Sequence, residues 1–143
     1  MKTVLKWLLA AAVVASLAVA LATWPLVADV ETGKTPEYPD LRVKEYAASP
    51  DRVAKAAESA LGKLEHWEIV GSGHGRAGHR MEAVHTALLG WKDDVSVRIW
   101  REGERTRVSV RSKSRMGKAD LGQNARNIRK FLAQLDISVG QTL

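Results

Sequence analysis

The sequence predicts an α+β domain in which an antiparallel five-stranded sheet carries two helices on one face, in the order β-α-β-β-β-β-α. Three observations lead to this fold class. Four segments between residues 66 and 114 alternate apolar and polar side chains as strands do, and they follow one another too closely for the crossovers that parallel strands need. Amphipathic helical patterns precede and follow these strands. An apolar stretch, long enough for a hydrophobic helix, stands before the domain.

The apolar stretch is residues 1–28, and it begins with the basic residues Lys2 and Lys6. Two interpretations remain open. A retained membrane anchor needs about 20 apolar residues, which the segment supplies. A cleaved signal peptide needs a small-x-small site, and residues 20–22 provide one, so that residues 1–22 would be removed. In both cases we expect a domain that faces the periplasm, either tethered to the inner membrane or secreted.

Residues 29–40 are polar and contain Pro36 and Pro39, which predicts a linker that holds the domain of residues 41–143 close to the bilayer. Residues 41–47 then alternate as a short edge strand does.

The first helix of the domain is predicted to start at Ser49, which can act as its N-cap. Pro50 takes the first helical position and Asp51 lies in the first turn, as helix starts favour. The buried stripe of this helix consists of Val53, Ala57, Ala60, Leu61 and Leu64.

The four central strands are expected at residues 66–72, 79–89, 92 or 93 to 101, and 106–114. The glycine-rich residues 71–78 are expected to form a mobile hairpin connection, since they lack the Gly-Lys-Ser/Thr of a phosphate-binding loop. Alternation directs one set of side chains toward the helices: Val95, Val97, Ile99, Val108 and Val110. It directs the other set to the outer face of the sheet: Ser96, Arg98, Trp100, Arg107, Ser109 and Arg111.

The last helix follows a basic loop. Asp120 is well placed to cap it, because its carboxylate can accept the free N–H groups of the first turn. The apolar stripe of this helix is expected to be Leu121, Ala125, Ile128, Leu132 and Leu135.

Three stretches carry a resemblance to a known family: EAVHTALLG at residues 82–90, WKDDVSVRIW at residues 91–100 and SRMGKADLGQN at residues 114–124. Together they resemble the uncharacterised bacterial family known as domain of unknown function 1499. The family pattern has Arg directly before the helical Ile, where this chain has Asn127. The resemblance implies a folded unit over residues 41–135 and implies no reaction.

The strand order is also similar to the helix-grip arrangement of TATA-binding-protein-like and START-like domains. Such an analogy concerns the fold and does not by itself give a function. Curved sheets that grip a helix often leave an apolar cavity, and here we expect its walls to be Trp67, Ile99, Ile128 and Phe131.

The histidines do not suggest a metal site. The chain has no cysteine, so thiolate ligands and thiol nucleophiles are excluded. Its four histidines are His66, His74, His79 and His85. His79 and His85 would lie about 20 Å apart along one strand, too far for one metal ion to join. We therefore expect neither a metal nor another cofactor.

A structural polar network is predicted from Asp93, Asp94, Asp120 and Asn124. Asp93 and Asp94 are adjacent, so they point to opposite faces of their strand and cannot act together as a catalytic carboxylate pair. Either Asp94 is expected to pair with Arg98 or Arg111 on the outer face, or Asp93 caps the turn after Trp91.

Anion binding is predicted for basic and hydroxyl side chains near the end of the last strand: Arg98, Arg111, Ser112, Ser114, Arg115 and Lys118. Most of them lie in the loop before the last helix, where the helix dipole attracts anions. No nucleophile–histidine–acid spacing accompanies Ser112 or Ser114, so we assign no catalytic residue and favour binding over catalysis.

Charge and location together suggest the class of partner. Eleven basic and three acidic residues lie between Arg98 and Lys130, while the whole chain carries a net charge of +6. An exported domain is an unsuitable nucleic-acid binder, and a basic face beside a membrane suits anionic headgroups. We expect non-enzymatic binding of a lipid or another apolar or anionic ligand. The alternatives are a protein-interaction module of the cell envelope and an enzyme that acts on an anionic envelope substrate at residues 112–124.

Overall fold

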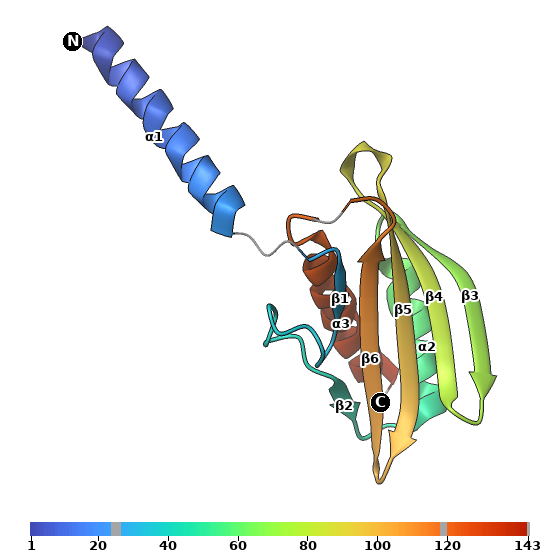
Figure 1. The fold of residues 1–143 in the computed structure, drawn as a ribbon. Helices are drawn as coiled ribbons and strands as arrows, with labels where there is room; N and C mark the ends of the chain where they lie inside the picture. Colours follow the sequence, from blue (N-terminus) through green and yellow to red (C-terminus); the bar gives the residue numbers. More distant parts are fainter. Residues whose placement is uncertain (24–26, 118–119, 143) are drawn as a thin grey trace.

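The computed structural model describes residues 1–23, 27–117 and 120–142. Helix α1 (Lys2–Thr23) stands apart from the domain and has no buried residue (Figure 1). Among the described residues it is the one helix that is long and apolar enough to cross a membrane, with a mean hydropathy of 2.3. A signal sequence near the N-terminus has the same properties.

The domain is an antiparallel sheet with two helices on one face, which confirms the predicted fold class (Figure 1). The strands are β1 Asp29–Glu31, β2 Lys44–Tyr46, β3 Trp67–Gly75, β4 Gly78–Thr86, β5 Lys92–Glu102 and β6 Arg105–Ser114. Their order across the sheet is β1-β6-β5-β4-β3, and β2 also pairs with β6. Helices α2 (Pro50–Lys63) and α3 (Gln123–Thr142) cover the inner face, and none of the described residues forms a helix over the outer face.

The segment predicted as a linker, residues 29–40, instead supplies a sixth strand. Strand β1 pairs with the last residues of β6, and Val30 is fully buried. This arrangement covers the edge of β6, which would otherwise expose unpaired backbone groups. The chain between α1 and the domain is therefore shorter than the sequence suggests.

The inner face of the sheet and the helices form one core. Ser49 accepts a hydrogen bond from the backbone N–H of Arg52, which confirms the predicted N-cap of α2. The inward side chains of β5 and β6 are fully buried, as the alternation predicts: Val95, Val97, Ile99, Val108 and Val110. Four alanines of α2 are also buried, which brings this helix close to its neighbours: Ala54, Ala56, Ala57 and Ala60.

The side chains expected to line an inner cavity belong to this core instead. Ile99, Ile128 and Phe131 are fully buried within the core cluster, and Trp67 packs against it. The reason is that α3 lies directly on the sheet and its apolar stripe occupies the available volume.

The glycine-rich stretch forms the predicted hairpin, but most of residues 71–78 are strand, so the connection is shorter than expected. Strand β3 runs to Gly75 and β4 begins at Gly78, so only Arg76 and Ala77 form the turn. Gly78 has a φ of +100°, and a Cβ atom there would lie 2.1 Å from the carbonyl oxygen of Ile99. Glycine is required at this position because the hairpin passes so close to β5.

Helix α3 begins later than its apolar stripe predicts. Leu121 has a φ of +51° and is 49% exposed, so it does not belong to the buried stripe. The carboxylate of Asp120 accepts hydrogen bonds from the backbone N–H groups of Gly122 and Asn124, which confirms its capping role. The other four predicted stripe residues are buried: Ala125, Ile128, Leu132 and Leu135.

Candidate functional site

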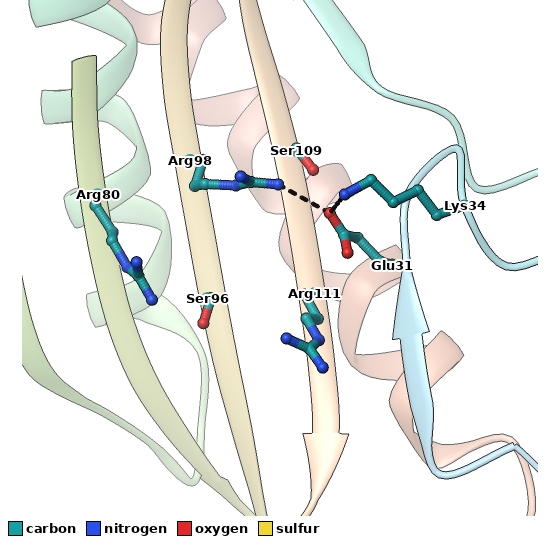
Figure 2. A pocket seen from close by; sticks show the side chains of 7 residues that line it. All are labelled: Glu31, Lys34, Arg80, Ser96, Arg98, Ser109 and Arg111. Atoms are coloured by element: carbon teal, nitrogen blue, oxygen red, sulfur yellow. Dashed lines mark hydrogen bonds and ion pairs between the residues drawn. The ribbon is translucent and has the colours of Figure 1, made fainter. Parts of the chain in front are cut away.

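The outer face of the sheet carries a polar pocket of about 260 Å³, which we call the basic pocket (Figure 2). Strands β4, β5 and β6 supply its floor, because every second side chain of a strand points to the same face. The segment that begins with β1 supplies one wall. The lining residues are Glu31, Lys34, Arg80, Ser96, Arg98, Ser109 and Arg111.

Glu31 lies at the centre of the charges in the basic pocket. Its Oε1 accepts Arg98 Nη2 at 2.9 Å and Lys34 Nζ at 2.8 Å, so both cations point toward it (Figure 2). The Glu31 side chain is only 17% exposed. This carboxylate thus holds two cations from different segments in one place.

Arg111 is held by Asp29. Its Nε and Nη2 donate to the two oxygens of that carboxylate at 2.8 and 2.5 Å. The hydrogen bond from Arg111 lowers the pKa of Asp29 below its ordinary value, although partial burial opposes the shift. Strand β1 therefore fixes the direction of the Arg111 guanidinium.

A third carboxylate orients the far side of the basic pocket. Glu82 accepts a hydrogen bond from Arg80 Nε at 2.5 Å and another from Ser96 Oγ at 2.6 Å. The four cations of the pocket, Lys34, Arg80, Arg98 and Arg111, thus face the three acids Asp29, Glu31 and Glu82. One positive charge is left in surplus, so an incoming anion must compete with carboxylates that are already present.

A second, less polar pocket of about 590 Å³ adjoins the basic pocket. Trp100 of β5 and Val43, which precedes β2, contribute apolar surface. Ala77 of the β3–β4 turn and Gly78, the first residue of β4, close one end. The two pockets share four residues: Lys34, Arg80, Arg98 and Ser109. Together they form one outer-face groove with a charged end and an apolar end.

The residues predicted to bind an anion lie in different places in the structure. Arg98 and Arg111 line the basic pocket. Ser112 is fully buried on the inner face, and Ser114 also points inward. Arg115 donates to Asp94 Oδ1 at 2.7 and 2.9 Å. Lys118 lies outside the described residues.

The predicted cradle for an anion in the loop before α3 is therefore not formed by its described residues. Asp94 pairs with Arg115, rather than with Arg98 or Arg111 as expected. The reason is that β1 brings Asp29 and Glu31 to these two arginines, and Asp94 lies opposite the end of β6.

A buried polar network fastens α3 to the sheet. Asp93 Oδ2 accepts Asn127 Nδ2 at 2.8 Å and lies 3.1 Å from His85 Nδ1, while Asp93 Oδ1 accepts Ser114 Oγ at 2.9 Å. Burial raises the pKa of Asp93, but the hydrogen bonds from His85, Asn127 and Ser114 outweigh it, so the pKa lies below its ordinary value.

Asn124 extends this network. Its Oδ1 accepts Ser112 Oγ at 2.6 Å, and its Nδ2 donates to Ser114 Oγ at 2.8 Å. Asp93 and Asn124 belong to the predicted network, whereas Asp94 lies outside it on an exposed ion pair. His85 and Asn127 are members that the sequence does not indicate, because their participation depends on the register between β4 and β5 and on the rotation of α3.

Two further features lie at opposite ends of the sheet. Exposed apolar side chains gather at the connections β4–β5 and β6–α3, an end that we call the tip: Leu88, Leu89, Trp91, Met116 and Leu121. The turn between β3 and β4 lies at the other end (Figure 1), and Asp51, His74 and His79 meet beside it. Their ligand atoms all lie within 4.8 Å of one another, which makes them the best-placed metal ligands among the described side chains.

Comparison with known proteins places this chain in a family. The sequence model described as "Protein of unknown function (DUF1499)" matches residues 16–135. The chain belongs to the DUF1499 family. The match contains the described residues of the outer-face groove and of the buried network, so both lie within the DUF1499 unit.

Other comparisons add little to the DUF1499 assignment. The crystal structure of TTHA0849 from Thermus thermophilus is similar over 78% of this chain and 96% of that chain, with 17% identity and a TM-score of 0.39. No curated protein matches the chain.

Proposed function

We propose that this DUF1499 protein is a membrane-tethered, non-enzymatic domain of the cell envelope that binds an amphipathic anion, such as a lipid, in the outer-face groove. The observation that carries the proposal is the union of two unlike pockets. Arg111 lies at one end of the groove, Arg80 and Arg98 lie where the two pockets meet, and the apolar surface of Trp100 and Val43 lies at the other end. A ligand with a charged head and an apolar body matches both ends.

The charged end is suited to a phosphate or carboxylate. Arginine presents several N–H donors in a planar fork and binds such groups with two parallel hydrogen bonds. Because Arg98 shares Glu31 with Lys34, an anion can take Arg98 while Lys34 keeps Glu31 neutralised. This exchange would leave no buried charge without a partner.

The position of the tether supports a membrane location. The backbone oxygen of Ala28 accepts hydrogen bonds from Ser114 N and Asn124 Nδ2, so the chain enters the domain at the tip. Only five residue steps separate Ala28 from Thr23, the last residue of α1, and they span at most about 17 Å. In the proposed orientation α1 crosses the inner membrane and the tip lies against its periplasmic surface.

The apolar tip also gives a second candidate function. Leu88 and Leu89 are 86% and 81% exposed, and Trp91 is 58% exposed. Exposed apolar clusters mark membrane or protein contacts. In a protein-interaction module of the envelope, this cluster would bind a partner protein. In the favoured proposal, the same cluster contacts the bilayer. The enzyme alternative is weakened because Ser112 and Asn124 are bonded to each other within the buried network.

The test is native mass spectrometry of the full chain, purified gently from membranes into nanodiscs. We expect a co-purifying amphipathic anion at about one per chain. Arg98→Gln should reduce its occupancy about tenfold, since a hydrogen bond to a charged group contributes about 1.5–3 kcal/mol. Arg101→Gln is the control, because Arg101 is exposed on the same strand and lies outside both pockets. Equal occupancy in both variants would contradict the proposal, and a bare chain that cross-links to a protein would favour the interaction module.

A further inference from the structure

The end of the sheet opposite the tip brings together three side chains that commonly ligate metals. His79 Nε2 lies 2.8 Å from Asp51 Oδ1. The rings of His74 and His79 lie side by side, with centroids 4.2 Å apart and planes tilted by 42°. All three ligand atoms fall within 4.8 Å of one another.

The fold explains why residues so distant in sequence meet. The two-residue turn after Gly75 makes His74 and His79 direct cross-strand partners, so their side chains share one face of the hairpin. Asp51 lies in the first turn of α2, whose start at Pro50 comes over this end of the inner face. The backbone at Gly78 lies close to the backbone of β5, and this contact fixes the position of the β3–β4 hairpin.

We propose that Asp51, His74 and His79 bind one divalent transition-metal ion, with Zn²⁺ as the expected species. Imidazole nitrogen is a typical ligand for zinc and its neighbours in the first transition row, whereas Mg²⁺ and Ca²⁺ prefer oxygen ligands. The proposal is independent of the function assigned to the outer-face groove.

The geometry needs only small movements to close on an ion. Two donors bound tetrahedrally to zinc at about 2.1 Å lie about 3.4 Å apart. The present separations run from 2.8 Å to no more than 4.8 Å, and Asp51 and His74 are exposed and free to adjust. The contact between His79 and Asp51 brings two of the ligands together, and the cross-strand register places the third, His74, beside them.

Three protein ligands leave one position open. A groove of about 440 Å³ surrounds the cluster and is also lined by Lys55, Glu58 and Arg80. A water molecule or a small ligand can therefore complete the coordination, as in zinc sites that keep an exchangeable position. The bound ion would also fasten the β3–β4 hairpin to the start of α2.

The test is isothermal titration of Zn²⁺ into the full chain in detergent, purified without a histidine tag, together with metal analysis by mass spectrometry. We expect one Zn²⁺ per chain. His74→Ala and Asp51→Asn should each weaken binding by about tenfold or more, because each removes one of three ligands. Titration with Co²⁺ should give the visible absorption bands of a four-coordinate site, and these should disappear in His74→Ala.

The control is His66→Asn, which removes an exposed histidine far from the cluster and keeps a side chain that tolerates the φ of +66° at this position. It should bind Zn²⁺ as the unaltered chain does. Three results would overturn the proposal. They are the absence of binding with up to about 100 µM Zn²⁺, equal losses of affinity in His66→Asn and His74→Ala, and half an ion per chain, which would indicate a site between two copies.

Discussion

The side-chain amide of Asn124 donates a hydrogen bond of 3.1 Å to the backbone oxygen of Ala28, a residue 96 positions earlier in the chain. This bond joins the start of α3 to the segment that leads from α1 into the domain. Ser114 N donates to the same oxygen at 2.9 Å, so the end of β6 takes part as well. The last helix, the last strand and the tether are therefore fixed to one another at the tip.

Asn124→Ala should destabilise the domain by about 2–3 kcal/mol. The substitution leaves the buried Ser112 hydroxyl and the Ala28 oxygen without the Asn124 side chain as partner, and a buried polar group that loses its partner costs about 1–3 kcal/mol. The measurement is urea unfolding of the full chain in detergent, followed by far-UV circular dichroism. Lys130→Ala, an exposed change on the same helix, should stay within about 0.5 kcal/mol. Equal stabilities for the two variants would show that the network contributes little.

The carboxylate of Asp93 should make the stability of the domain fall in acid. Its pKa is lower in the folded chain than the ordinary value of 3.8, so the folded state favours the ionised form. The resulting stabilisation is complete above about pH 4 and is lost as the pH falls through the lowered pKa. Asp93→Asn should therefore be less stable than the unaltered chain at pH 7, and the difference should shrink below pH 4.

Unfolding free energies measured from pH 2.5 to pH 7 check this expectation. Asp94→Asn is the matched control, because Asp94 is the neighbouring residue and forms an exposed ion pair with Arg115, which contributes at most about 1 kcal/mol. A difference between Asp93→Asn and the unaltered chain that stays constant down to pH 2.5 would contradict the role given to the ionised carboxylate.

Gly78→Ala should be strongly destabilising, by about 2 kcal/mol or more. The added Cβ would lie 2.1 Å from the Ile99 oxygen, and the φ of +100° is unfavourable for any residue with a side chain. Gly73→Ala on the preceding strand is the control, since a Cβ there meets nothing within 4 Å. Thermal unfolding of both variants provides the comparison. A Gly78→Ala chain as stable as Gly73→Ala would mean that β4 and β5 are farther apart than the structure places them.

The fold was largely predictable because apolar and polar side chains alternate with a period of two residues along each long strand. The inward Val95, Val97 and Ile99 follow this period, and the same rule places Arg98 and Arg111 on the outer face. The short β1 could not be recognised in the same way. It spans three residues and buries one side chain, so its sequence shows no periodic pattern. It becomes a strand because its backbone pairs with the edge of β6.

The candidate sites were less predictable, because they depend on register between distant segments. Glu31 and Lys34 of the basic pocket come from the stretch expected to be a linker. His74 and His79 become partners only when the turn between them has two residues, and the sequence around them, HGRAGH, contains no Asn-Gly or Asp-Gly pair that would predict such a turn. Asp51 joins the two histidines only because of where α2 crosses the sheet, and no local sequence pattern predicts that position.

The tip should enter the membrane interface when the full chain is placed in nanodiscs that contain anionic lipid. The chain has no cysteine, so a single Leu88→Cys substitution can be labelled with an environment-sensitive fluorophore without further changes. Leu88 is 86% exposed and lies beside Leu89 and Trp91, and aromatic side chains favour the membrane–water interface. We expect a blue-shifted emission that spin-labelled lipid quenches. The same label at Glu104→Cys, in the turn between β5 and β6 at the other end of the sheet, should remain solvent-exposed and unquenched. Identical emission at the two positions would show that the domain does not rest on the bilayer by its tip, and the exposed leucines would then be assigned to a protein partner.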